Sequence, residues 1–157
     1  MGNIMDNGFA VINEEQDLDI ADKSIASNLT LLETVLRSDP DNDHYLLLAS
    51  IGYTSYALGF VEDESIDRAR LLYLRGKNFG MKILLHDQAF ADALTKGPGE
   101  FAAALSSFSQ DDVPAIFWTA VSWGSYINVT LTDPSAIADL PKVEAMMRFV
   151  VQHDPAF

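Results

Sequence analysis

Apolar residues recur at intervals of three and four positions along most of this 157-residue chain, the spacing of helices that bury one face. Between positions 17 and 37 the predicted buried stripe is Leu18, Ala21, Ile25, Leu29, Leu32, Val35 and Leu36. The same spacing predicts further helices over 43–61, 67–85, 88–94, 100–108, 113–131 and 141–152. No stretch bounded by turns alternates apolar and polar residues with period two, so the predicted fold class is all-α.

Prolines and glycines divide the predicted helices. The first helix is expected to end at Ser38-Asp39-Pro40, because proline cannot continue the hydrogen-bond ladder. Lys96-Gly97-Pro98-Gly99 predicts a loop or lid. With 48% apolar residues the chain supplies one core, so we expect an acidic, flexible segment over 1–16 and a single helical domain over 17–157.

The charge balance excludes some partners and sites. Ten Lys and Arg against 23 Asp and Glu give a net charge of −13, and positions 1–45 alone carry −8. Such a surface repels nucleic acid and anionic bilayers, so neither is expected as a partner. The sequence as written contains no cysteine, which excludes disulfides and thiolate metal sites, and no apolar run approaches the ~18 residues of a membrane span. The longest early apolar run, 9–12, is too short for a secretory signal, so the leader of an exported protein is expected outside this sequence.

Two pairs of helices repeat a common pattern. Leu48-x-x-Ile51-Gly52-x-x-Ser55 and Ala120-x-x-Trp123-Gly124-x-x-Ile127 echo the first helix of a tetratricopeptide repeat, with a small residue where the paired helix approaches. The ends of the first and last helices, at Asp39-Pro40 and Asp154-Pro155, also echo each other. The sequence therefore predicts a degenerate tetratricopeptide-like α-solenoid. Because such units bury their faces only by stacking, we expect the chain to be part of a longer solenoid, with end helices that expose apolar side chains.

Several segments carry a likeness to a known family in the expected order. They are Gly52-Tyr53, Tyr56-Ala57-Leu58-Gly59-Phe60-Val61-Glu62, Ala69-Arg70-x-Leu72-Tyr73, Asp112-Val113-Pro114-Ala115-x-Phe117-Trp118-x-Ala120-x-x-Trp123-Gly124 and Ile137-Ala138-Asp139-Leu140-Pro141. Over about 30–157 the chain resembles the TRAP transporter T-component (TatT) family.

The resemblance implies an all-helical, tetratricopeptide-like protein of the bacterial periplasm. Members are exported, lipid-anchored and often trimeric, and they are proposed to associate with the solute-binding protein of a tripartite ATP-independent periplasmic (TRAP) transporter. The family's leader, its lipidated cysteine and the further C-terminal helices expected after Phe157 are absent from the sequence given.

Aromatic residues on two predicted helices are the candidate binding residues. The first set is Trp118, Trp123, Tyr126 and Asn128, and the second is Tyr53, Tyr56 and Phe60. Core packing is the alternative for all the aromatic members, and we expect it for Trp123, which lies beside Gly124. Aromatic residues with a polar tip also suit a partly wet groove, where a small apolar or mixed solute binds if both sets face one cavity and Asn128 offers a hydrogen bond.

One predicted helix holds half of the basic residues, Arg68, Arg70, Arg75, Lys77 and Lys82. They form either a solvated face or a patch that meets an acidic partner or a carboxylate, and Arg75, beside Gly76, is the preferred functional residue.

The sequence predicts neither an enzyme, a metal site nor a bound cofactor. Asp39-x-Asp41-x-Asp43 lacks the glycine and the bidentate glutamate of a calcium loop, and the three histidines are isolated in sequence. A hydrolase would need Asp111, Asp112 and a histidine to converge in a cleft, whereas helix capping explains the two acids. The predicted function is a non-enzymatic component that binds a solute-binding protein and a small solute. The alternative is a generic scaffold that binds a peptide or helix in its groove.

Overall fold

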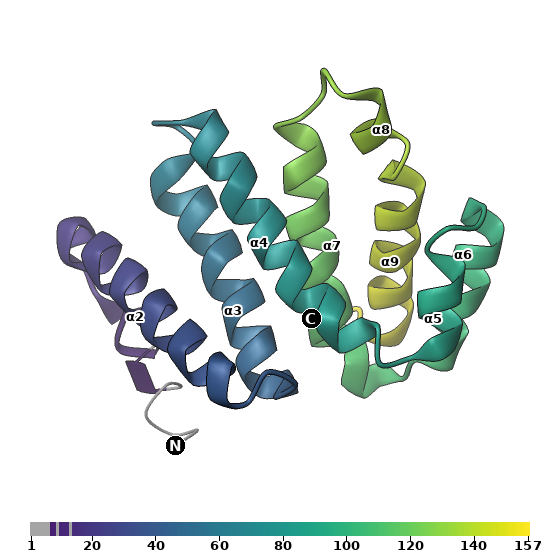
Figure 1. Ribbon diagram of the computed structural model, residues 1–157, viewed down its shortest axis with the longest axis horizontal. Helices are drawn as coiled ribbons and strands as arrows, with labels where there is room; N and C mark the ends of the chain where they lie inside the picture. Colours follow the sequence, from purple (N-terminus) through teal and green to yellow (C-terminus); the bar gives the residue numbers. More distant parts are fainter. Residues whose placement is uncertain (1–6, 9, 13) are drawn as a thin grey trace.

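The structure, a computed structural model, describes residues 7–8, 10–12 and 14–157 (Figure 1). Its elements are α2 (Leu18–Ser38), α3 (Asp43–Tyr56), a π-helical turn η1 (Ala57–Val61), α4 (Ile66–Leu84), α5 (Gln88–Ala93), α6 (Pro98–Ala104), two 3-10 turns η2 (Leu105–Ser107) and η3 (Gln110–Asp112), α7 (Val113–Asn128), α8 (Pro134–Ile137) and α9 (Leu140–His153). The described part of the chain contains no strand, which confirms the all-α prediction.

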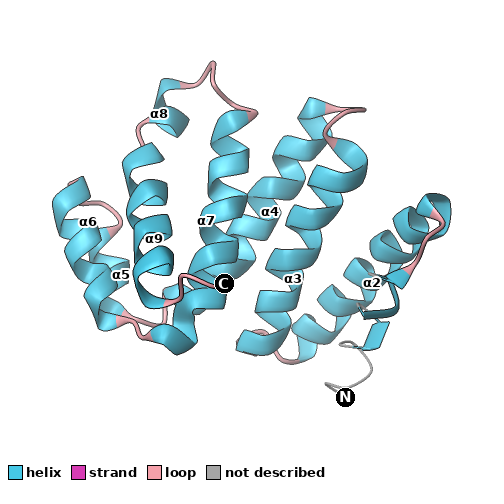
Figure 2. Ribbon diagram, turned by 180° about the vertical axis from the view of Figure 1, so that it is seen from behind, coloured by secondary structure: helices cyan, strands magenta, loops and turns pink. Residues whose placement is uncertain are grey.

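The long helices lie side by side as a row in chain order. α2 packs on α3, α3 on α4, α4 on α7 and α7 on α9, and the short helices α5 and α6 cover the outer side of α9 (Figure 1; Figure 2 shows the same row from behind). Three apolar clusters fill the row: one between α2 and α3, one between η1 and α4, and a larger one among α4, α5, α6, α7 and α9. Each helix therefore buries its apolar face against its neighbours in the row. The finer tetratricopeptide-like repeat pattern stays a prediction.

Helix α4 makes the closest contacts of the row, through two glycines. A Cβ atom at Gly76 would lie 2.6 Å from Thr54 Oγ1 of α3, and one at Gly80 would clash with Thr119 Oγ1 of α7. Thr54 Oγ1 and Ser122 Oγ of α7 lie 2.5 Å apart across the same crossing. The α3–α4–α7 centre is thus held by small residues and buried hydroxyl groups, because a larger side chain would force the helices apart.

Local signals set most helix starts. The Asn42 side chain accepts a hydrogen bond from Tyr45 N at 3.1 Å and caps α3, and Ser65 caps α4. The loop predicted over 96–99 is shorter than expected, because Pro98 is already inside the first turn of α6, where its missing N–H costs nothing. Helix α7 ends at Asn128 rather than at 131, and the chain turns there, with Thr130 N donating to Ile127 O at 2.9 Å.

The predicted role of Asp112 as the cap of α7 is wrong in detail. Its Oδ2 accepts hydrogen bonds from Ser109 N at 2.8 Å and Ser109 Oγ at 3.0 Å, so it closes the 3-10 turn before α7. Its side chain makes no capping hydrogen bond to α7 itself. The Asp112 carboxylate can accept hydrogen bonds either from the amides of α7 or from Ser109. In this structure it accepts them from Ser109.

Helices α2 and α9 expose apolar side chains, but so do η1 and α4 in the middle of the row, at Leu58, Ile66 and Leu71. Exposed residues include Leu18, Ile20 and Leu31 on α2, and Leu140 and Val151 on α9. Of the segment 1–16, the described residues 7–8, 10–12 and 14 are helical and Ile12 is buried, while the flexibility expected for this segment stays a prediction that falls partly outside the described residues. Among the described helices, none has the length and apolar character needed to cross a membrane.

Candidate functional site

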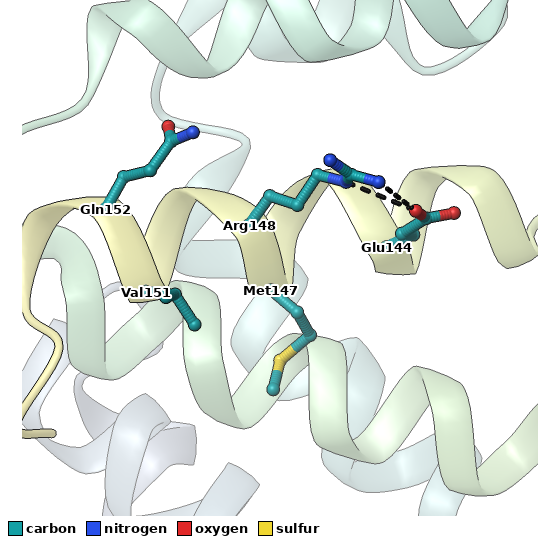
Figure 3. Close-up of a pocket in the computed structure, with 5 residues that line it drawn as sticks. All are labelled: Glu144, Met147, Arg148, Val151 and Gln152. Atoms are coloured by element: carbon teal, nitrogen blue, oxygen red, sulfur yellow. Dashed lines mark hydrogen bonds and ion pairs between the residues drawn. The ribbon is translucent and has the colours of Figure 1, made fainter.

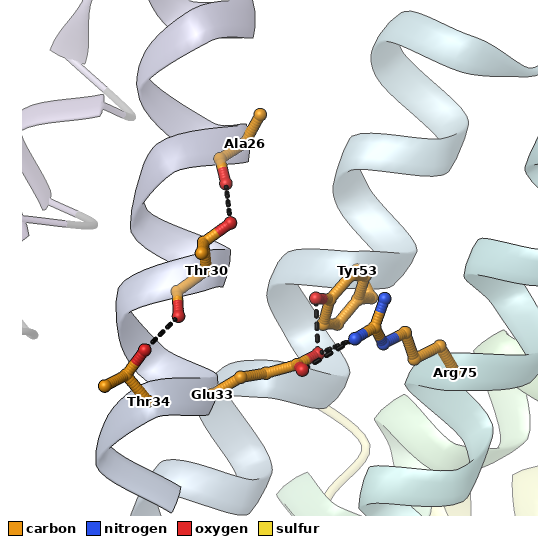
Figure 4. Close-up of polar contacts among 6 residues, drawn as sticks. All are labelled: Ala26, Thr30, Glu33, Thr34, Tyr53 and Arg75. Atoms are coloured by element: carbon orange, nitrogen blue, oxygen red, sulfur yellow. Dashed lines mark hydrogen bonds and ion pairs between the residues drawn. The ribbon is translucent and has the colours of Figure 1, made fainter.

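Glu33, Tyr53 and Arg75 form a polar cluster that joins α2, α3 and α4 (Figure 4). Arg75 forms an ion pair with Glu33 at 2.6 Å, and the Tyr53 hydroxyl donates to Glu33 Oε1 at 2.5 Å. The Arg75 guanidinium also lies 4.8 Å from the centre of the Tyr53 ring. Arg75, the preferred basic residue of the sequence analysis, is therefore engaged within the fold, where it ties α2 to α4.

Burial and the neighbouring Glu33 carboxylate both raise the pKa of Tyr53 above its ordinary value. Tyr53 is 6% exposed, and its neutral form is favoured because an ionised phenolate would lie beside the Glu33 carboxylate. Tyr53 also stacks on Phe79 of α4, with ring centres 5.8 Å apart. This predicted site residue thus lies in the interface between helices.

Tyr56 and Phe60 line a pocket of about 250 Å³ between the start of α2, the turn η1 and the start of α4. Their rings stack with centres 6.0 Å apart. The wall also contains three carboxylates and one guanidinium, those of Asp19, Asp22, Glu64 and Arg68. We call it the α2–η1 pocket; it combines an aromatic wall with charges of both signs.

A π-helical turn begins directly after Tyr56 and contains Phe60. In η1 the Glu62 N–H donates to Ala57 O, five residues back, at 2.9 Å. Such a turn inserts an extra residue into the helix and re-aims the side chains that follow it, and π turns occur frequently at functional sites. Burial and a hydrogen bond to Asp22 raise the pKa of Tyr56, while Arg68 lowers it. The Tyr56 hydroxyl is therefore within reach of both charges.

Trp123 lies under two lysines from different helices. Lys77 Nζ of α4 is 4.1 Å from its ring centre, and Lys142 Nζ of α9 is 5.9 Å from it. The indole is 3% exposed, so the expected packing role of Trp123 is confirmed. The sequence did not predict that Lys77 and Lys142 both contact the Trp123 ring, because positions 77 and 142 lie far apart in the chain.

The other candidate binding residues of α7 lie in different surroundings from one another. Trp118 is partly buried and meets Phe117 edge to face at 5.4 Å, and Asn128 is exposed at the end of the helix. Tyr126 is partly buried and packs against the cluster of η1 and α4, the same cluster on which Tyr56 and Phe60 pack. Tyr126 packs as well against the larger cluster that contains Trp123, whereas Trp118 meets Phe117.

The five basic residues of α4 divide between two faces. Arg68 and Arg75 act on Tyr56 and Tyr53 of α3, whereas Lys77 turns to Trp123 of α7. Arg70 pairs with Asp67 of its own helix at 3.2 Å, and Lys82 lies over Phe79 at 5.8 Å. They do not form a single basic patch, because a helix with 3.6 residues per turn separates positions 75 and 77 by more than half a turn.

Acidic residues and a histidine meet at the junction of α3, α4 and α7. Asp43, His44, Asp111 and Asp112 line a pocket of about 200 Å³ with Leu47, Ile83, Pro114 and Ala115. These acids and the histidine therefore line one pocket, which their spacing in the sequence did not predict. Asp112 is already bound to Ser109, and no group of three or more His, Asp or Glu among the described residues is arranged to hold a metal ion. We assign no chemistry to this pocket.

A further hollow of about 380 Å³ lies along the surface of α9 (Figure 3). Its lining residues are Glu144, Met147, Arg148, Val151 and Gln152. Glu144 and Arg148 form an ion pair at 2.6 Å along the helix. All five lining residues belong to α9, so this hollow is a shallow feature of one helix surface and encloses a ligand less well than the α2–η1 pocket.

Comparison with known proteins identifies the family. The model of the family described as TRAP transporter T-component matches residues 14–157, which include almost every described residue. A search of curated proteins finds no match. The family match covers the aromatic segments 52–62 and 112–124 and all the helices of the row, and it confirms the resemblance seen in the sequence. The chain belongs to the TRAP transporter T-component family.

Proposed function

We propose that this chain binds the solute-binding protein of a TRAP transporter and receives a small solute of mixed apolar and polar character in the α2–η1 pocket. Family membership associates the chain with a TRAP transporter. The proposed binding of a solute rests on the residues of the α2–η1 pocket. A pocket that offers stacked aromatic rings beside a guanidinium and carboxylates suits a small molecule with both an apolar part and polar groups.

The observation that carries the proposal is the pairing of Tyr56 and Phe60 in that pocket. Both were candidate binding residues from the sequence, and both line the pocket together with Arg68. Phe60 is only partly buried, so its ring has a face available to a ligand. Arg68 offers planar, charge-assisted hydrogen bonds to an acceptor at the same wall.

The cellular setting is proposed from the family alone. We propose a periplasmic location, a lipid anchor, a tetratricopeptide-like repeat organisation and assembly as a homotrimer. The exposed apolar residues of α2 and α9 support assembly, because contacts between subunits would cover them.

A scaffold that binds a peptide or helix remains the alternative function. Its surface would be the hollow on α9, where Met147 and Val151 lie beside an ion pair. We prefer the α2–η1 pocket, because residues of four elements, α2, α3, η1 and α4, line it, whereas residues of one helix line the hollow.

Two measurements on the purified chain test the proposal. Native mass spectrometry reports the subunit number and any retained small molecule, and surface plasmon resonance reports binding to the purified solute-binding protein of the transporter. We expect Phe60→Ala to lower solute affinity about tenfold, since truncating an aromatic anchor costs more than about 1 kcal/mol.

Leu58→Ala is the matched control. Leu58 lies on the same turn and is 64% exposed, but it is not a pocket residue. Circular dichroism checks that both variants keep their helices. Equal solute binding by the two variants would exclude the pocket, and failure of the native chain to bind the solute-binding protein would exclude the proposed partner.

A further inference from the structure

The charged side chains of the α2–η1 pocket do not balance. Asp19, Asp22 and Glu64 contribute three negative charges to its wall, and Arg68 contributes one positive charge. Asp22 and Arg68 are both engaged, because each interacts with the Tyr56 hydroxyl. The carboxylates of Asp19 and Glu64 have no hydrogen-bond or ion-pair partner among the residues that the structure describes. Three negative charges and one positive charge leave the pocket at −2, with two carboxylates that no described cation compensates.

The aromatic rings of the same pocket favour a cation as well. Tyr56 and Phe60 stack with ring centres 6.0 Å apart, and both side chains are only partly buried. The negative face of an aromatic ring attracts an ammonium group that lies within about 6 Å of its centre, and quaternary ammonium ligands are recognised in this way. A carboxylate beside such a ring adds direct Coulomb attraction. The α2–η1 pocket therefore combines the two kinds of group that bind an ammonium group.

An anionic ligand would meet an unfavourable potential in this pocket. Arg68 is the single cationic residue of its lining, and the guanidinium already interacts with Tyr56. The surrounding part of the chain, positions 1–45, carries a net charge of −8, which attracts cations and repels anions. The pocket volume of about 250 Å³ is also below the roughly 300–1,000 Å³ of pockets that hold drug-sized ligands. Charge and size together indicate a small cation.

We propose that the α2–η1 pocket binds a small organic cation, whose ammonium group contacts the aromatic rings of Tyr56 and Phe60 and is neutralised by Asp19 and Glu64. The inference rests on the proposed function, because it concerns the same pocket, and it names the chemical class of the solute. Arg68 then donates to a neutral oxygen atom of that cation, such as a hydroxyl or carbonyl oxygen.

Isothermal titration calorimetry of the full chain with three probes of similar shape tests this ligand class. The probes are choline, the alcohol in which carbon replaces the choline nitrogen, and sodium tert-butylacetate. They carry a positive charge, no charge and a negative charge. At low ionic strength we expect choline to bind about tenfold more tightly than the neutral alcohol, and tert-butylacetate to show no saturable binding. Added sodium chloride should weaken choline binding and leave the binding of the alcohol unchanged.

Glu64→Gln removes one carboxylate of the pocket and keeps the size of the side chain. We expect it to lower choline affinity about threefold, the worth of one exposed ion pair, and to leave the affinity for the neutral alcohol unchanged. Asp63→Asn is the matched control, because Asp63 is the exposed neighbour of Glu64 and does not line the pocket. It removes the same charge from the chain, and we expect it to bind choline as the native chain does.

Three results would overturn the inference: no saturable choline binding, choline binding no tighter than that of the alcohol, or equal losses of choline affinity in Glu64→Gln and Asp63→Asn. The proposed function fails on a different result. A neutral alcohol or a retained solute that the native chain binds and Phe60→Ala does not would keep the pocket as the solute site, even where the preference for a cation is absent. Equal binding by the native chain and Phe60→Ala would reject the pocket itself.

Discussion

Replacing Gly80 by alanine tests whether close contact at the centre of the row stabilises the fold. In an exposed helix the change would stabilise the chain by about 1 kcal/mol, because glycine is the poorer helix former. Here the new methyl group would clash with Thr119 Oγ1 and lie 3.1 Å from Ser50 Oγ. Thr119 is fully buried and donates to Ala115 O at 2.6 Å, so it cannot turn away without losing that bond.

The magnitude follows from these opposing effects. Forcing a methyl group into a packed core costs about 1–3 kcal/mol, and loss of a buried hydrogen bond adds about 1 kcal/mol. After the gain in helix propensity, we expect a net loss of about 1–3 kcal/mol in the free energy of unfolding. For a chain of this size each kcal/mol lowers Tm by about 2–4 °C.

Urea and thermal unfolding followed by circular dichroism measure the change. Gly124→Ala is the control, since Gly124 also lies within a helix but a Cβ there would meet only Val143 Cγ1, at an ordinary 3.4 Å. We expect this variant to match or exceed the native stability. A Gly80→Ala chain as stable as the Gly124→Ala chain would refute the close-contact reasoning.

Two further predictions concern the cluster of α2, α3 and α4. Glu33→Gln removes the ion pair to Arg75, whose side chain is 51% exposed, so we expect a loss of less than about 1 kcal/mol but faster hydrogen exchange in 18–38; unchanged exchange would show that the pair does not hold α2. The raised pKa of Tyr53 means that above about pH 10 the native state keeps a proton that the unfolded chain loses, so stability should fall as pH rises from 9 to 11. Burial raises the pKa of Tyr56 and Tyr73 as well, so Tyr53→Phe should reduce this slope only in part in unfolding titrations, and an equal slope in both chains would contradict the assignment.

Local sequence signals predicted the helices because those signals act over a few residues. Asn42 and Ser65 satisfy amides within the next turn, and Pro40 prevents continuation of α2. Arg68 and Arg75 are seven residues apart, which places them on one face of the helix, and they contact Tyr56 and Tyr53 of α3. The turn η1 was not predicted, because the same apolar spacing fits an α-helix through position 61.

The sequence by itself determined the all-α class, the main helix boundaries, the family and the identity of the aromatic candidates. The tertiary structure alone decided which of those residues meet. Glu33 with Arg75, and Lys77 with Lys142 above Trp123, are brought together from different helices. The physical reason is that helical periodicity fixes the direction of a side chain around its own axis, whereas its partners depend on how neighbouring helices pack. In this chain that packing is set by the close approach of α4 to α3 and α7 at Gly76 and Gly80.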